Sequence, residues 1–276
     1  MPRNRRNIPV NKIADRSKTG IFFKHTSDWG NGAALDFPHR DDYYMLSILL
    51  EGDVKVAVDF KSLTLRSGEG LILVPGQVHL PQTKDMPPDG WSLFVSPDHI
   101  EETDRHLLER YALAPVPLKF TEEMSSDIAR LFGMLRRYEY DGGFSRAAVT
   151  AIVKLFCRSV TIPGEIECDR FTILTLRLKS LLGKNLSAGK GPGAYASMLN
   201  ISGVYLNEAV KSVTGMSAGE FIRSQILLNA KRQLAHTSLT VGEVAAALGY
   251  DDCSYFSRLF KKETGLTPSE FRKNLG

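Results

Sequence analysis

The last third of the chain carries an internal repeat of about 50 residues, and this repeat constrains the fold more than any other feature. Aligning the segment with itself pairs Ala196 and Leu199 with Ala245 and Leu248, at an offset of 49 residues. The offset becomes 50 for the pairs that follow, which are Tyr205 with Tyr255, Leu206 with Phe256, Val210 with Phe260, Lys211 with Lys261, Thr214 with Thr264, Gly215 with Gly265, Glu220 with Glu270, and Phe221 with Phe271. The chain therefore holds two copies of one small unit, with one residue inserted inside the second copy.

Helix starts are marked in both copies by the pattern Ser/Thr-x-x-Glu. It occurs at Ser217–Glu220, Thr240–Glu243 and Thr267–Glu270. In this capping box the hydroxyl accepts from the N–H three residues later, and the glutamate accepts from the N–H of the first residue. Pro268 strengthens the third start, because proline suits the first helical position. The first start predicts a long helix over Ser217–Ala235 that joins the two copies.

Each copy reads as a short helix, a tight turn and a second helix with a polar or basic face. This order is typical of a helix-turn-helix, whose second helix lies in the major groove of DNA. In the second copy, Glu243–Leu248 precedes a helix that Asp251 or Asp252 caps and that runs to about Glu263. In the first copy, Ala194–Leu199 supports a helix capped by Ser202. The candidate DNA-binding residues are Ser202, Tyr205, Asn207, Glu208 and Lys211 in the first copy, and Asp252, Cys253, Ser254, Ser257, Arg258 and Lys261 in the second.

The charge distribution separates this region from the rest of the chain. The net charge of +4 is too small to identify a partner by itself. Residues 171–276 hold 13 Lys and Arg against 7 Asp and Glu, while residues 1–170 hold 22 against 24. A basic segment beside a slightly acidic one predicts a nucleic-acid module joined to a part with a different task.

The first 100 residues favour β structure. Short apolar or alternating runs are separated by turn signals at intervals of about 8–12 residues, which predicts a sandwich or barrel. The runs are Tyr44–Leu50, Val54–Asp59, Leu63–Arg66, Leu71–Val74 and Trp91–Val95.

The middle of the chain changes to a helical period. Apolar residues recur every three or four positions in Thr121–Tyr140 and again in Phe144–Val160. The stripe from Met124 to Tyr138 is explained equally by packing within the chain and by a helix pair in a dimer. Pro163–Asp169 is the predicted linker.

Three ordered motifs of the second copy resemble those of AraC/XylS-type transcription regulators. The motifs are Thr240-Val-x-Glu-Val-Ala-x-x-Leu-Gly-Tyr250, Ser254-Tyr-Phe-Ser-Arg-x-Phe-Lys-Lys262 and Thr264-Gly-x-Thr-Pro-Ser-Glu-Phe-Arg272, within a resemblance that covers residues 192–274. The first copy departs from the pattern at Gly203 and Glu208. The resemblance implies a DNA-binding transcription regulator; we expect an activator, while the sequence does not separate an activator from a repressor. Its expected partners are double-stranded promoter or operator DNA, a small-molecule effector, RNA polymerase and a second copy of the chain.

The N-terminal part is similar to the cupin-like sensor barrels that many members of that family carry. Pro38-His39 and Leu65-x-x-Gly-Glu-Gly70, followed by Leu71–His79, fall where cupin motifs fall. Catalytic cupins supply a larger metal-binding set than His39 and His79, so we expect no metal and no cofactor. A ligand pocket inside the barrel is expected instead. Its candidate residues, weighed against simple core packing, are His39, Tyr43, Tyr44, His79 and Trp91.

These features together predict an α+β chain. The expected domains are an N-terminal cupin-like β-barrel (1–120), a helical linker or dimerisation segment (121–165), and an all-α DNA-binding domain with two helix-turn-helix units (170–276). The alternatives are a cupin-type metal-dependent enzyme with an accessory helical domain, and an adaptor that binds protein; we expect no enzyme. Apolar runs too short for a membrane span, a basic N-terminus without an apolar segment after it, and only three cysteines favour the cytoplasm.

Overall fold

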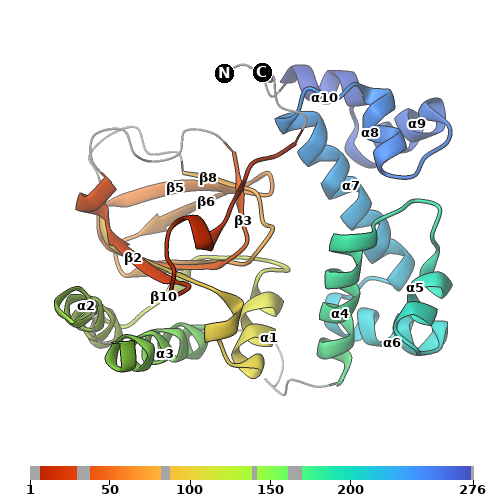
Figure 1. The fold of residues 1–276 in the computed structure, drawn as a ribbon. Coiled ribbons are helices and arrows are strands. Elements are labelled where there is room, and N and C mark those ends of the chain that lie inside the picture. Colours follow the sequence, from red (N-terminus) through yellow and green to blue (C-terminus); the bar gives the residue numbers. More distant parts are fainter. Residues whose placement is uncertain (1–6, 30–37, 82–87, 139–141, 161–169, 275–276) are drawn as a thin grey trace. The chain divides into compact units, whose positions relative to one another are not determined.

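The computed structural model describes residues 7–29, 38–81, 88–138, 142–160 and 170–274 (Figure 1). They form two compact units. The β-rich unit contains β1 to α3, and the helical unit contains α4 to α10. The predicted linker, Pro163–Asp169, lies outside the described residues.

Strands and short 3₁₀ turns dominate the β-rich unit. The strands are β1 (Val10–Asn11), β2 (Ile21–His25), β3 (Arg40–Asp41), β4 (Tyr44–Glu51), β5 (Asp53–Val58), β6 (Lys61–Arg66), β7 (Glu69–Leu73), β8 (His79–Pro81), β9 (Asp89–Val95) and β10 (Leu118–Lys119). The five predicted runs are confirmed as β4, β5, β6, β7 and β9. The sequence reading did not identify β2, because Ile21–His25 carries neither clean alternation nor a marked turn on its C-terminal side.

β4 lies at the centre of a five-stranded sheet of order β10-β7-β4-β9-β2, whose pairs are all antiparallel. Leu46 stands opposite Ile72 on one side and Leu93 on the other, so these three side chains form a row on one face of the sheet. The neighbouring residue, Ser47, belongs to the other face, where its hydroxyl lies 2.8 Å from that of Ser92. β6, β5 and β8 form a second sheet, and β1 pairs with β3 in a third.

Helices α1 (Glu102–Tyr111), α2 (Glu122–Arg137) and α3 (Gly142–Ser159) complete the β-rich unit. Figure 1 shows α2 and α3 side by side beneath the five-stranded sheet. The ring of Trp91 stacks on Phe132 of α2 with centroids 5.1 Å apart, on the same face as the Leu46 row. Most of the stripe from Met124 to Tyr138 therefore packs inside the unit. Its exposed member is Tyr138, at 46%, and Met134 beside the stripe is 41% exposed.

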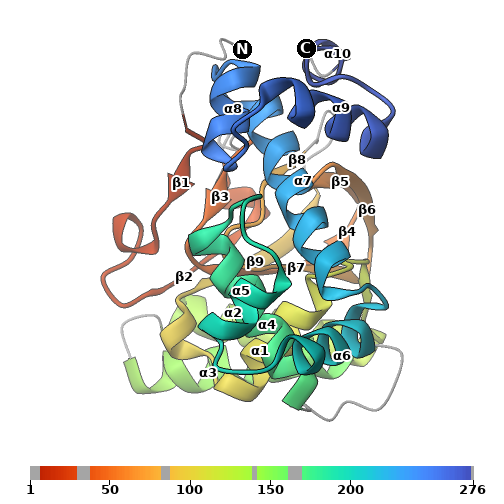
Figure 2. The same cartoon turned by 90° about the vertical axis from the view of Figure 1, so that its right-hand side faces the viewer.

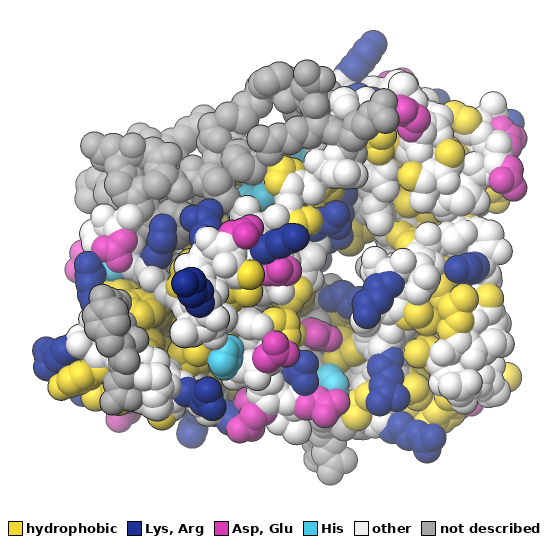
Figure 3. Space-filling view, viewed as in Figure 1, with side chains coloured by type: hydrophobic (Ala, Val, Ile, Leu, Met, Phe, Trp, Pro, Cys, Tyr) yellow, Lys and Arg dark blue, Asp and Glu magenta, His cyan; other side chains and the backbone are white. Residues whose placement is uncertain are grey.

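Charges of both signs cover the β-rich unit. Figure 3 shows basic and acidic side chains intermixed over it. Lys154 Nζ lies 2.6 Å from a carboxylate oxygen of Glu101 and 2.8 Å from one of Asp104. Such pairing agrees with the nearly balanced charge of the first 170 residues.

The helical unit contains α4 (Arg170–Asn185), α5 (Pro192–Met198), α6 (Gly203–Thr214), α7 (Ala218–His236), α8 (Val241–Ala247), α9 (Cys253–Thr264) and α10 (Pro268–Asn274). All three predicted capping boxes are present. The carboxylates of Glu220, Glu243 and Glu270 accept from the N–H groups of Ser217, Thr240 and Thr267 at 2.8, 2.7 and 2.8 Å. Among the described residues, no helix has the length and apolar character needed to cross a membrane.

Candidate nucleic-acid interface and sensor pocket

The two copies of the repeat build the same turn between their helices. In the second copy, the N–H of Tyr250 donates to the carbonyl of Ala245 at 3.0 Å. In the first copy, the N–H of Ile201 donates to the carbonyl of Ala196, also at 3.0 Å. The two bonds are related by the offset of 49 residues. Figure 2 shows α7 running from the α5–α6 pair to the α8–α9 pair, as the long connecting helix was predicted to do.

Each turn contains one residue with a positive φ, and the two residues differ. Gly249 has φ +80°, whereas Asn200 at the matching position has φ +55°. A Cβ on Gly249 would lie 2.5 Å from Ser187 Oγ. The second turn therefore requires glycine for its backbone and for space, while asparagine suffices in the first.

α9 presents a polar and basic surface opposite its buried side. Its cap is Asp252, whose carboxylate accepts from the N–H of Ser254 at 2.7 Å. Phe256 and Phe260 are buried at 2% and 1% exposure and fix which side faces inward. Of the predicted residues on the outward side, Ser257 is half-buried. The others are exposed: Asp252, Cys253, Ser254, Arg258 and Lys261.

Arg258 is the most prominent cation on this surface. Its side chain is 73% exposed, and Nη2 lies 3.9 Å from Oδ2 of Asp252. A pair this exposed contributes little energy, so the guanidinium remains available to an anion. Tyr255, 53% exposed beside it, was missed by sequence reasoning. The signal was available, because Tyr255 lies three residues before Arg258 and so shares its side of the helix.

α6 offers a smaller and less basic surface. Ser202 caps it by accepting from the N–H of Tyr205 at 3.1 Å. Of the predicted residues, Ser202, Glu208 and Lys211 are exposed. Val204, at 71% exposure, is also on this surface and was not predicted. An exposed valine at the start of a helix offers an apolar contact. It was not predicted because the candidate residues of α6 were chosen mainly for their polar side chains.

The remaining two predicted residues of α6 are occupied within the unit. The guanidinium carbon of Arg170 lies 5.2 Å from the centre of the Tyr205 ring, and Phe171 packs edge-on against that ring at 5.5 Å. The side-chain oxygen of Asn207 accepts from the N–H of Ala218 at 3.0 Å. Tyr205 and Asn207 are half-buried and tie α6 to α4 and α7, so they are positioned as structural residues.

The predicted ligand-binding residues of the β-rich unit fall into two groups. Tyr44 is 1% exposed and donates its hydroxyl to Glu109 Oε1 at 2.8 Å. Burial, together with the Glu109 carboxylate, raises the pKa of the Tyr44 phenol. Trp91 stacks on Phe132. Both side chains lie on the face that the helices cover, so the structure does not place them in one pocket with the others.

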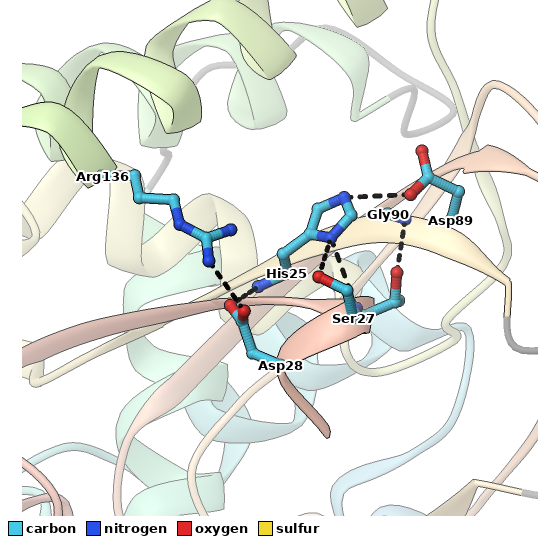
Figure 4. Close-up of polar contacts among 7 residues, drawn as sticks. His25, Ser27, Asp28, Asp89, Gly90 and Arg136 are labelled. Carbon is cyan, nitrogen blue, oxygen red and sulfur yellow. Dashed lines mark hydrogen bonds and ion pairs between the residues drawn. The ribbon is translucent and has the colours of Figure 1, made fainter. Parts of the chain in front are cut away.

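A polar network joins the end of β2 to Asp89 and Arg136 (Figure 4). His25 lies against the indole, with ring centroids 4.5 Å apart, and its Nε2 is 2.9 Å from Asp89 Oδ1. Arg136 Nη2 donates to Asp28 Oδ1 at 3.0 Å. The pKa of Asp28 falls below its usual 3.8 because the His25 N–H donates to its carboxylate and Arg136 lies near. The end of α2 is thereby tied to the 3₁₀ turn Thr26–Trp29 that follows β2, and the guanidinium carbon of Arg136 lies 6.0 Å from the centre of the Trp91 ring.

The second group is His39, Tyr43 and His79, and Tyr43 lies close enough to the neighbouring Asp41 for that carboxylate, after burial, to raise the pKa of the Tyr43 phenol. The ring of Tyr43 packs edge-on against Phe94 at 5.8 Å, and the rings of the two histidines lie 4.3 Å apart. His39 and His79 also pair through their backbones in an isolated bridge. Burial, and then the neighbouring His39, lower the pKa of His79 to about 4. These three residues are the part of the predicted pocket that the fold brings together.

Asp41 completes this group and was not among the predicted residues. It is 5% exposed, and its carboxylate oxygens lie 3.9 Å from Nε2 of His39 and 3.5 Å from Nε2 of His79. The signal for it was its spacing, because residues two apart in an extended segment point to the same side. A carboxylate that the sequence analysis did not group with the two histidines therefore stands beside them.

Two family models match the chain. Residues 32–154 match the AraC-like ligand binding domain, and residues 195–274 match a helix-turn-helix domain. Together they cover both units.

Curated relatives match a little over a third of the chain. The chain is 32% identical over 99 residues to the HTH-type transcriptional activator RhaR of Cronobacter sakazakii, a match that covers 36% of this chain and 35% of that protein. It is 31% identical over 104 residues to RhaR of Salmonella heidelberg, covering 38% and 36%. The chain thus spans about a third of the length of these relatives.

Among solved structures, the C-terminal domain of AraT, a response regulator from Geobacillus stearothermophilus, matches with a TM-score of 0.36 at 29% identity, covering 38% of this chain and 88% of that one. Unsaturated fatty acid bound ToxT from Vibrio cholerae matches with a TM-score of 0.43 at 15% identity, covering 91% and 94%.

Proposed function

Because the chain belongs to the AraC-type family of transcription regulators, we propose that it binds promoter or operator DNA in a sequence-specific manner and regulates transcription in response to a small molecule. The observation that carries this proposal is the pair of helix-turn-helix units with matching turns, joined by α7. Two equivalent units suit two successive major-groove segments, about one helical turn or ~34 Å apart.

The second unit supplies the stronger DNA contacts. Arg258 and Lys261 would meet phosphates or guanine edges, since guanidinium and ammonium groups are the usual donors to both. Ser254 and Ser257 would adjust register or read bases, and Tyr255 would pack against the groove wall. The Asp252 carboxylate at the cap repels phosphate, so it favours a base-directed approach of α9 over one along the backbone.

The first unit would contribute fewer polar contacts. Lys211 would meet phosphate, and Ser202 would bring the N-terminus of α6 towards the backbone. Glu208 would accept from a cytosine amino group, while Val204 would contact a thymine methyl group. Tyr205 and Asn207 would act indirectly, by holding α6 in place.

The β-rich unit would sense the effector. His39, Tyr43 and His79 would contribute to the effector pocket. Tyr44 and Trp91 would support the sheet from the face that the helices cover. We further propose that the chain is cytoplasmic and activates transcription through contact with RNA polymerase. It would act as a dimer, and the exposed apolar side chains of Met134 and Tyr138 would contribute to the dimer interface. We propose that its output is DNA binding and not catalysis, as in the family to which it belongs.

A titration of labelled DNA tests the DNA-binding proposal. The full chain is added to duplexes selected from the source genome by affinity, and to scrambled duplexes of the same composition, at several salt concentrations. We expect the selected sites to bind at least ~1000-fold more tightly than scrambled DNA, with an affinity that falls as salt rises. Equal affinity for both sets would contradict sequence-specific binding, and no binding at low salt would contradict DNA binding altogether.

A further inference from the structure

The group formed by His39, Asp41 and His79 has the composition and geometry of a metal site. One ligand atom from each residue can be chosen such that all lie within 4.8 Å of one another, and no other cluster of this kind occurs in the ranges that the structure describes. All three residues are buried, at 4% to 5% exposure. We propose that this group binds one divalent transition-metal ion of the Zn²⁺ or Fe²⁺ class.

The hydrogen bond of His79 points to a cation. Its Nδ1 lies 3.4 Å from the carbonyl oxygen of Gln77, which accepts only, so Nδ1 carries the proton. In the neutral ring, Nε2 then holds a lone pair, and this atom faces Asp41 Oδ2 at 3.5 Å. Two acceptors in a buried site repel each other unless a proton or a metal ion lies between them, and a metal ion satisfies both lone pairs at once. A histidine whose far nitrogen donates to a backbone carbonyl is also the usual arrangement of a metal ligand.

Asp41 is held in position at its carboxylate and at its backbone. Asn11 donates its side-chain N–H to Oδ1 at 2.9 Å. The backbone carbonyl of Asp41 accepts from the N–H of Gly76 at 2.9 Å, which ties it to the turn before His79. The ligands are thus oriented before any ion arrives, and this lowers the cost of binding.

The separations agree with a small transition-metal ion. Ligands about 2.0–2.1 Å from a tetrahedral Zn²⁺ lie about 3.3 Å from each other, close to the 3.5 Å and 3.9 Å between the Asp41 oxygens and the histidine nitrogens. Two imidazoles and one carboxylate suit Zn²⁺ or Fe²⁺. Ca²⁺ and Mg²⁺ prefer oxygen ligands and more of them. Three protein ligands leave a position for water or for a donor atom of an effector.

An ion here would connect separate parts of the β-rich unit. Asp41 lies in β3, His79 in β8, and these strands belong to different sheets. Binding would therefore stabilise the folded unit, since an ion that binds only the folded state raises the free energy of unfolding. This inference does not rest on DNA binding and would stand if the chain bound no DNA.

The test is a Zn²⁺ titration of the full chain after chelation, in competition with a chromophoric chelator. We expect the unaltered chain to bind one Zn²⁺ ion per molecule. Asp41→Asn and His79→Gln should each weaken binding at least tenfold, the loss that even outer-sphere changes produce. His106→Gln, a histidine of α1 outside the group, is the matched control and should bind as the original chain does. Failure of the original chain to bind Zn²⁺, or equal affinity in all four proteins, would overturn the proposal.

Two further measurements cover misfolding of the variants and binding by cysteine. Co²⁺ is added to the original chain and to Cys253→Ser, which removes an exposed thiol. We expect the same visible spectrum from both, without a thiolate charge-transfer band, and a higher Tm for the original chain with Zn²⁺ than without. A thiolate band, or Zn²⁺ binding without any change in Tm, would place the ion elsewhere and refute the site.

Discussion

The side-chain oxygen of Asn207 accepts a hydrogen bond from the N–H of Ala218 at 3.0 Å, and this bond fastens the recognition helix of the first unit to the start of α7. Ala218 is the first residue of α7, so its N–H has no partner within the helix. Asn207, which the sequence suggested as a DNA contact, thus holds α6 against α7.

Replacing Asn207 with alanine should therefore reduce stability without changing base preference. Leaving the Ala218 N–H without its acceptor should cost about 1–3 kcal/mol in the free energy of unfolding. Chemical denaturation of the full chain measures this cost, and selection from a random duplex library measures base preference. A shifted preference with unchanged stability would show that Asn207 reads DNA directly.

Arg258→Ala should weaken DNA binding. If the guanidinium contacts a base, we expect a loss of about 1–3 kcal/mol, concentrated at one position of the site. If it contacts only phosphate, the loss should be similar for all sequences, with a shallower dependence on salt. Arg130→Ala removes an equally exposed arginine from α2 in the β-rich unit and serves as control. Equal losses in both variants would mean that total charge, and not the α9 surface, governs binding.

The capping boxes should make stability depend on acidity. Hydrogen bonds from Ser217 and Thr267 hold the pKa of Glu220 and Glu270 below the ordinary value of 4.5. A carboxyl with a lowered pKa in the folded state stabilises it above pH 4.5, and this contribution is lost as the pH falls through the folded-state value. The urea concentration at the midpoint of unfolding should therefore decrease as the pH is lowered from 5 to 3.

The Glu220→Gln and Glu270→Gln double variant tests that assignment. Glutamine retains an acceptor for the capping box but does not titrate in this range, so part of the acid dependence should disappear. An unchanged pH profile would assign the effect to other carboxyl groups.

Two glycines of the β-rich unit should respond to alanine in opposite directions. A Cβ on Gly70 would lie 2.6 Å from the Ser47 carbonyl oxygen and 2.5 Å from the Phe120 ring, so Gly70→Ala should destabilise the protein by about 1–3 kcal/mol. Gly133 lies within α2 with no atom near its Cβ position. Gly133→Ala should stabilise by about 0.5–1 kcal/mol through helix propensity. Thermal unfolding measures both, and equal shifts would contradict the packing described for β7.

The helical unit was largely predictable because its signals are local. Capping boxes, an inserted residue and buried positions at helical spacing all act over a few residues, and they gave α7, α8 and α9 nearly to their ends. The site surfaces were less predictable. Tyr205 and Asn207 turn inward because α4 and α7 approach them, and no pattern within α6 reveals those neighbours.

In the β-rich unit the misses come from long-range pairing. Tyr43 and Tyr44 were grouped as pocket residues, although adjacent residues entering a strand point to opposite faces. Trp91 was also grouped with them. Its side of the sheet depends on its pairing with Ile48 of β4, and the residues around Trp91 in the sequence do not reveal that pairing. The meeting of Asp41 with His79 depends on the bridge between residues 39 and 79, which are 40 positions apart. The helix α1 was missed because half of its ten residues are Asp, Glu or Arg, which leaves few apolar positions to mark a helical period.

The central claim, that two helix-turn-helix units read DNA together, is tested most directly by hydroxyl-radical footprinting of the full chain on its selected site. We predict two protected segments on one face of the duplex, centred about one helical turn or 10–10.5 base pairs apart, and Arg258→Ala should weaken one of them first. A single protected segment, or protection spread evenly along the duplex, would contradict the account.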